Sequence, residues 1–185
     1  MYDEQRGSDI RTQAASGETD INAGDVASEV DSLYSQFWRD VYGYAFMLVR
    51  HREDAEDVAS ETFLRAYASW LRASKPEGPA LPWLLLIARR IVIDRARRRR
   101  LIAWLPLGPR HDVEQDVLKN TELWLWFDRV SQLLTPRQRE ALVLRYQFDL
   151  PDPVIARVMG LSSAGVRTLV SRALSALRQH PELLQ

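Results

Sequence analysis

Basic side chains are concentrated in one short stretch of the chain, where residues 88–100 read ARRIVIDRARRRR. Arg90, Asp94, Arg97 and Arg98 follow the spacing of one helix face, opposite an apolar face. Asp94 can pair with Arg90 or Arg98, and the remaining guanidinium groups can neutralise phosphates, which releases counterions. The stretch therefore predicts a nucleic-acid contact, with a solvated run of charge as the alternative.

Trp83 stands at the start of the same predicted helix, directly after a proline-rich loop. An aromatic ring in this position could stack on an unpaired base, or it could belong to the core. The predicted nucleic-acid contact of this helix therefore includes Trp83.

A different kind of surface is predicted on the preceding helix. Asp57, Glu61 and Leu64 recur at i, i+4 and i+7, on the face opposite the apolar stripe. An exposed leucine between carboxylates offers both apolar burial and complementary charge to a basic partner. The row predicts a protein-docking surface, although an ordinary solvated face would show the same period.

The C-terminal residues predict a helix-turn-helix, with a short helix in PVIARVMG, a turn at residues 160–162 and a longer amphipathic helix. On the last helix, Arg167, Thr168, Ser171 and Arg172 face away from the apolar stripe. Such a helix can enter the major groove and present arginine to guanine edges or phosphates. A plain pair of antiparallel helices is the alternative.

Side chains for enzyme chemistry are sparse. His51, His111 and His180 are scattered without the spacing of a metal site, and the chain has no cysteine. No glycine-rich phosphate loop or nucleophile elbow is present. The sequence predicts no catalytic residue, no metal and no cofactor.

These surfaces are expected on an all-α protein of two small helical domains. Residues 1–28 are acidic and polar and are predicted to be a disordered extension, because they have no apolar period. Residues 29–100 form the first predicted domain, residues 101–121 a flexible linker, and residues 122–185 the helix-turn-helix domain. The segment LTPRQ predicts a helix start with Thr135 as N-cap, proline at the first position and a capping box completed by Gln138.

The apolar positions of the predicted helices define their core faces. On the helix of the docking row the inward positions are Ala55, Val58, Ala59, Thr62, Phe63, Ala66 and Trp70. On the arginine-rich helix they are Leu84, Ile87, Ala88, Ile91 and Val92, and on the last helix Val166, Leu169, Val170, Ala173, Leu174 and Leu177.

The net charge of zero conceals unlike blocks of sequence. Residues 1–30 hold seven acids and two bases, whereas residues 76–110 hold eight bases and two acids. Such asymmetry indicates polyanion contact at particular places rather than over the whole surface. The chain shows neither a basic leader nor an apolar run long enough to cross a bilayer, so we expect a cytoplasmic protein without membrane insertion.

Three segments in this order resemble the extracytoplasmic-function group of bacterial sigma factors, which belongs to the sigma-70 family. They are EDAEDVASETFLRAY at 53–67, WLLLIARRIVIDRARR at 83–98 and LTPRQREALVLRY at 134–146, followed by the helix-turn-helix. The resemblance implies a non-enzymatic protein that binds core RNA polymerase, directs it to promoters and helps to melt the DNA. Members of this group are often held by an anti-sigma factor, and the sequence identifies none.

The resemblance also implies roles for the residues that match its motifs. The segment that docks on the clamp helices of the β′ subunit matches Asp57, Glu61, Phe63 and Leu64. The segment near the minus-10 element matches Trp83, Arg89, Arg90, Asp94, Arg97 and Arg98. The reader of the minus-35 element matches Arg167, Thr168, Ser171 and Arg172, in a domain that also binds the β-subunit flap.

The chain departs from the family pattern in both DNA-binding segments. Arg90 stands where asparagine is usual, and the entry to the helix-turn-helix reads PDPVIA, without the usual serine and glutamate. Leu169 replaces a common arginine of the recognition segment, so the minus-35 contacts are expected to be weaker.

Two other functions fit parts of the sequence. A stand-alone helix-turn-helix regulator would use the N-terminal half for dimerisation or sensing, and a polymerase-binding inhibitor would use the docking row alone. The acidic docking row beside a separate arginine-rich helix argues against the regulator, because a sigma factor needs both surfaces.

Overall fold

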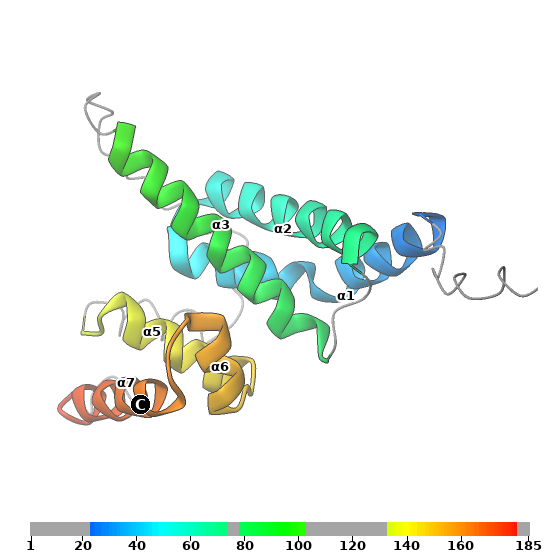
Figure 1. Ribbon diagram of the computed structural model, residues 1–185. Coiled ribbons are helices and arrows are strands. Elements are labelled where there is room, and N and C mark those ends of the chain that lie inside the picture. The colour runs from blue at the N-terminus through cyan, green and yellow to red at the C-terminus, as the bar shows by residue number, and fades with distance from the viewer. Residues whose placement is uncertain (1–22, 74–77, 103–132, 181–185) are drawn as a thin grey trace, which may run out of the picture.

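The computed structural model describes residues 23–73, 78–102 and 133–180 (Figure 1). Within these ranges the chain is helical and has no strand, as the sequence predicted. Three long helices come first: α1 (Ala23–Val49), α2 (Arg52–Ala73) and α3 (Ala80–Ile102). The C-terminal part contains α5 (Pro136–Leu142), a π-helical turn η1 (Val143–Gln147), α6 (Asp152–Met159) and α7 (Ser163–Arg178).

The N-terminal helices form a bundle in which α1, α2 and α3 all pack on one another. All seven predicted core positions of α2 are buried, and on α3 the predicted Leu84, Ala88 and Ile91 are fully buried. Ile87 and Val92 are only partly buried, whereas Leu85, which the period did not select, is fully buried.

The predicted boundary at residue 28 is wrong, because α1 already begins at Ala23. Val26 and Val30 lie one helical turn apart and are buried in a small cluster with Trp70 of α2. Their burial explains why the helix starts earlier than expected. Residues 1–22 of the predicted extension lie outside the described residues.

The C-terminal bundle begins as its local sequence predicted. Thr135 is the N-cap of α5, its side chain accepts from the backbone of Gln138, and Gln138 Oε1 accepts in return from Thr135 N over 2.8 Å. Gly160 ends α6 in the left-handed conformation, with φ of 65°, which a glycine adopts at little cost. Ser162 then caps α7, so the predicted helix-turn-helix is confirmed.

The remaining linker and domain boundaries are only partly described. The arginine-rich helix α3 continues to Ile102, so residues 101 and 102 of the predicted linker are helical. The rest of the linker, and the helix predicted around residues 123–133, lie outside the described residues, apart from a turn at residues 133–134.

The two bundles are not separate bodies in this structure. Helix α3 lies against α6 and α1 against α5, and one cluster of buried side chains runs through both bundles. In Figure 1, the C-terminal helices lie below α1 and α3. This contact between the bundles was not predicted, because amphipathic periods show which face is buried and not what covers it.

Candidate functional site

The docking row lies on the outer face of α2, as predicted. The side chain of Asp57 is 71% exposed and Leu64 is 69% exposed, whereas Phe63 is buried beneath them. A leucine so exposed on a helix surface leaves apolar area that no other described residue covers. The row therefore offers an apolar residue and a carboxylate on one accessible face.

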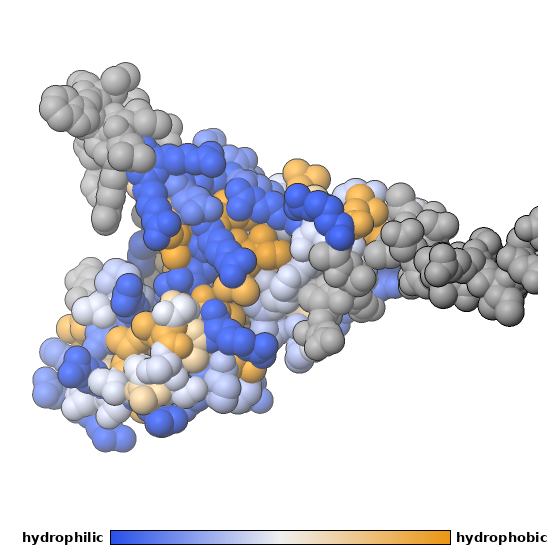
Figure 2. Space-filling model, in the orientation of Figure 1, coloured by the Kyte–Doolittle hydropathy of each residue, from blue (hydrophilic) through white to orange (hydrophobic). Residues whose placement is uncertain are grey.

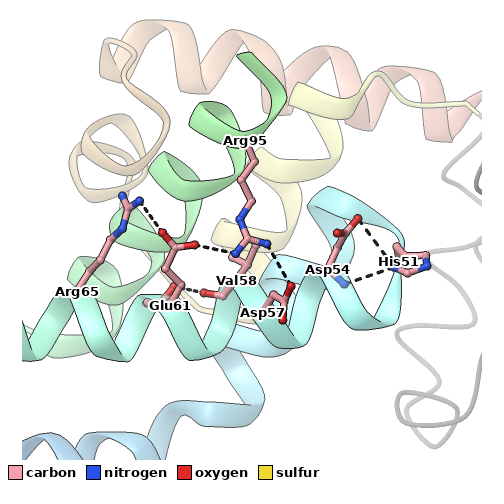
Figure 3. A network of polar contacts seen from close by, with 8 residues as sticks. His51, Asp54, Asp57, Val58, Glu61, Arg65 and Arg95 are labelled. Carbon is pink, nitrogen blue, oxygen red and sulfur yellow. Dashed lines mark hydrogen bonds and ion pairs between the residues drawn. The ribbon is translucent and has the colours of Figure 1, made fainter. Parts of the chain in front are cut away.

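Arg95 of α3 braces the acidic members of this row (Figure 3). Its Nη2 donates to Glu61 Oε2 over 2.7 Å, and its Nη1 lies 3.8 Å from Asp57 Oδ2. Arg65 donates to the other oxygen of Glu61 over 2.6 Å. The two arginines hold Glu61 in one orientation, while Asp57 keeps most of its charge open to solvent.

The electrostatic setting of Glu61 follows from these contacts. Partial burial alone would raise its pKa, but hydrogen bonds from Arg95 and Arg65 outweigh that effect and lower the pKa below its ordinary value of 4.5. Glu61 is therefore ionised throughout the neutral range, and the row keeps its negative charge.

Arg95 was not among the predicted site residues, although the sequence contains a signal for it. Arg95 follows Ala88 and Ile91 at the spacing of the buried face of α3. A charged residue at the edge of an apolar stripe needs a partner, which Asp57 and Glu61 supply across the helix pair.

The basic face of α3 contains Arg90, Arg97 and Arg98, which are all exposed. Figure 2 shows hydrophilic side chains gathered over the C-terminal half of this helix. Within the described part of the chain, these three arginines have no ion-pair partner. Their charge is available to a polyanion, which supports the predicted location of the nucleic-acid contact.

The predicted pairing of Asp94 is wrong. Asp94 Oδ2 lies 3.9 Å from Arg65 Nη1 on α2, and among the described residues it pairs with neither Arg90 nor Arg98. Arg65 reaches Asp94 because α2 and α3 pack side by side. The predicted pair, in contrast, would have joined two residues of α3.

Trp83 and Arg89 make contacts inside the molecule. The partly buried ring of Trp83 packs edge-on against Trp70, with 6.4 Å between ring centroids. Arg89 donates through Nε to Glu140 of α5 over 2.6 Å. In this arrangement, neither side chain lies on the open arginine surface of α3.

The recognition helix α7 presents one exposed surface made by Arg167, Thr168, Ser171 and Arg172. The opposite face contains four buried residues and the partly buried Leu169 and Leu174. Arg167 Nη1 lies 3.8 Å from Asp152 Oδ2, at the first turn of α6. The structure thus brings the four predicted residues together on a face that no other described helix covers.

Two kinds of feature are absent from the described ranges. No group of three or more histidine or acidic side chains there could hold a metal ion. None of the described helices has the length and apolar character that a membrane span requires.

Each of the two bundles matches a known family model. The family model for sigma-70 region 2 matches residues 33–102, and the model for sigma-70 region 4 matches residues 124–177. The chain is 28% identical to the ECF RNA polymerase sigma factor SigX of Bacillus subtilis, with 83% of this chain and 84% of the relative covered. It is 35% identical to a probable RNA polymerase sigma-C factor of Mycobacterium bovis, with 66% and 68% covered.

The fold has a close counterpart among solved structures. The sigma factor RpoE of Bartonella quintana, solved in complex with the anti-sigma factor NepR, matches with a TM-score of 0.64. The match covers 85% of this chain and 97% of the other, at 21% sequence identity. The similarity supports the arrangement of helices in both bundles.

Proposed function

This chain belongs to the extracytoplasmic-function group of the sigma-70 family and is an RNA polymerase sigma factor, and on that premise we propose which of its surfaces bind polymerase and promoter DNA. The observation that carries the proposal is the placement of two unlike surfaces on adjacent helices. An acidic and apolar row on α2 lies beside an open arginine face on α3.

The α2 row binds core polymerase, on the clamp helices of the β′ subunit. Leu64 supplies the apolar area that becomes buried, and Asp57 supplies exposed negative charge to a basic partner. Glu61, held by Arg95 and Arg65, adds charge in a fixed orientation. Phe63 supports the row from below, because it packs against Tyr34 and Trp38 of α1.

The α3 face binds the minus-10 element and the strand separated from it. Arg90, Arg97 and Arg98 contact phosphates, because they are exposed and have no ion-pair partner among the described side chains. Asp94 lies at the border of this face with the docking row, 3.9 Å from Arg65. Trp83 and Arg89 contribute after release from their present contacts.

The C-terminal bundle reads the minus-35 element through α7. Arg167 and Arg172 reach base edges or phosphates, and Thr168 and Ser171 complete the surface. The same bundle also contacts the β-subunit flap. With Leu169 turned partly into the core, this helix offers fewer basic side chains than the family pattern.

The protein acts without catalysis of its own and in the cytoplasm, where core polymerase is found. An anti-sigma factor is a further partner that we propose, because the matched Bartonella protein was solved with one. The family match does not favour a stand-alone regulator.

Reconstitution of the purified chain with core polymerase tests the assignment. We expect start-site-specific transcripts only when both components are present, and a promoter gel shift that requires polymerase. A strong shift by the chain alone, together with no transcription from the reconstituted enzyme, would contradict it.

A further inference from the structure

Asp152 is the one acidic residue of α6, the first helix of the helix-turn-helix. It lies in the first turn, where the helix dipole favours a carboxylate, but its side chain is only 19% exposed. Its Oδ1 atom is withdrawn from solvent. A carboxylate buried to this extent needs a cationic partner to remain ionised, so its place at the helix start does not explain it alone.

The two oxygens of Asp152 face arginines from two different elements. Oδ1 pairs with Nη2 of Arg145 in η1, the element before α6. Oδ2 lies 3.8 Å from Nη1 of Arg167 in α7, the helix after it. Arg145 is partly buried, whereas the side chain of Arg167 is 62% exposed. The pair with Arg145 therefore anchors the carboxylate, and the free oxygen of the anchored group faces the recognition surface.

The pair between Asp152 and Arg167 acts on orientation more than on stability. Its 3.8 Å separation is too long for a hydrogen bond, and a pair with so exposed a guanidinium contributes little to folding. An arginine side chain without a neighbour samples many rotamers, and a fixed carboxylate favours those that keep the guanidinium beside it. Asp152 thus limits the directions of Arg167 while most of that guanidinium stays open to a ligand.

The other arginine of the recognition surface, Arg172, has no such tether. It is exposed, and within the described ranges it has no ion-pair partner. Arg167 lies in the N-terminal half of α7 and Arg172 in the C-terminal half. The N-terminal residues of a recognition helix are those that contact base edges. A base contact needs the planar donors of arginine in one orientation, whereas a phosphate contact serves to position the protein.

We propose that Asp152 is a positioning residue for the minus-35 element. It holds the guanidinium of Arg167 toward one base pair and thereby sets the sequence preference there without touching DNA, while the untethered Arg172 contacts phosphate. This role rests on the proposed function, because α7 must be the reader of that element. A carboxylate near DNA also repels phosphates, so Asp152 lowers the affinity for every sequence while it adds preference at one position.

The test uses the full chain assembled with core polymerase. The probe is a library of duplexes from a promoter that this holoenzyme transcribes, with the minus-35 element randomised. Sequencing of bound and unbound duplexes gives the preference at each position for the parent, Asp152→Asn, Arg167→Ala and the double variant. The matched control is Asp149→Asn, which removes the same charge from an exposed position of the same bundle. Asparagine also adopts the left-handed backbone found there, with φ of 49°.

We expect Arg167→Ala to lose the preference at one position of the element. Asp152→Asn should reduce the preference several-fold at that position only, and its binding to duplexes with a scrambled element should not weaken. The double variant should match Arg167→Ala alone, because the effect of Asp152 passes through Arg167. Asp149→Asn should keep the preference of the parent at every position.

Circular dichroism checks that each variant is folded. If Asp152→Asn loses helical content, Asp152→Glu replaces it. Glutamate keeps the charge beside Arg145 and is longer by one methylene, so the preference should still change at the position read by Arg167.

Three results in folded variants would overturn the role of Asp152. They are an unchanged preference, a loss spread evenly over all positions of the element, and a double variant with less preference than Arg167→Ala. Failure of the proposed function looks different, because the parent itself would then show no preference anywhere in the element, and the role of Asp152 would fall with it.

Discussion

Arg95 and Glu61 join the arginine-rich helix to the acidic docking row through a hydrogen bond of 2.7 Å between Nη2 and Oε2. The pair lies at the border between two surfaces of opposite charge. Arg95 holds an acidic side chain of the docking row, whereas its neighbours Arg97 and Arg98 face solvent.

Reversal of charge at Asp57 should weaken binding to core polymerase. Asp57→Arg places like charge against a basic partner, so we expect a loss of several kcal/mol in binding free energy. Because Asp57 is 71% exposed and only loosely paired with Arg95, the fold should be retained. Affinity is measured by fluorescence anisotropy of the labelled chain with core enzyme. The control Glu53→Arg makes the same charge change one turn earlier, and an equal loss in both variants would argue against the row.

Glu61 should make the stability of the protein depend on pH in the acid range. Its pKa is lowered in the folded state, so the unfolded chain binds its proton first as the pH falls. The contribution of ionised Glu61 to the free energy of unfolding is complete above its ordinary pKa of 4.5. It is lost as the pH falls through the lower pKa of the folded state. Since Glu61 and Arg95 are both partly exposed, we expect about 0.5–1 kcal/mol at neutral pH.

Urea unfolding of the parent and of Glu61→Gln over a pH series measures this contribution. The difference in unfolding free energy should shrink toward zero at acid pH. A difference that stays constant across the series would mean that the variant acts through packing rather than through charge.

Loss of the arginines on α3 should abolish promoter opening and leave polymerase binding intact. Arg97→Ala combined with Arg98→Ala removes two exposed cations that have no ion-pair partner among the described residues. For single-stranded DNA, the slope of log affinity against log salt should fall by about 0.7 for each phosphate contact removed. Permanganate footprinting and a salt titration of the holoenzyme check both effects.

Arg39→Ala combined with Arg72→Ala is the matched control, because it removes two exposed arginines from α1 and α2. If the control lost promoter opening to the same extent, net charge rather than the α3 face would be responsible.

Substitution on α7 should reduce discrimination at the minus-35 element. A good arginine contact to a base contributes about 1–3 kcal/mol, and Arg167 and Arg172 are the exposed arginines that begin the recognition surface. Arg167→Ala combined with Arg172→Ala should make the holoenzyme nearly indifferent to scrambling of that element. Competition transcription measures the ratio of transcripts from the intact promoter to those from the scrambled one. The control Arg178→Ala, at the end of the same helix, should leave this ratio unchanged.

Much of the fold could be read from the order of residues, because helical period and capping are local properties. Residues within a few positions of each other determine the seven core positions of α2, the capping box of Thr135 and Gln138, and the turn at Gly160. The same helical period places Asp57 and Leu64 on the face opposite the core, where both are exposed. The three family motifs then indicated the function.

Only the tertiary structure decided which side chains meet across helices. Asp94 pairs with Arg65 rather than within its own helix, and Glu140 is buried between bundles rather than exposed on α5. These contacts depend on how α2 crosses α3 and how α3 lies on α6, and helical period carries no information about either packing. The sequence alone therefore determined the surfaces that each helix offers, whereas packing determined which of them stay open.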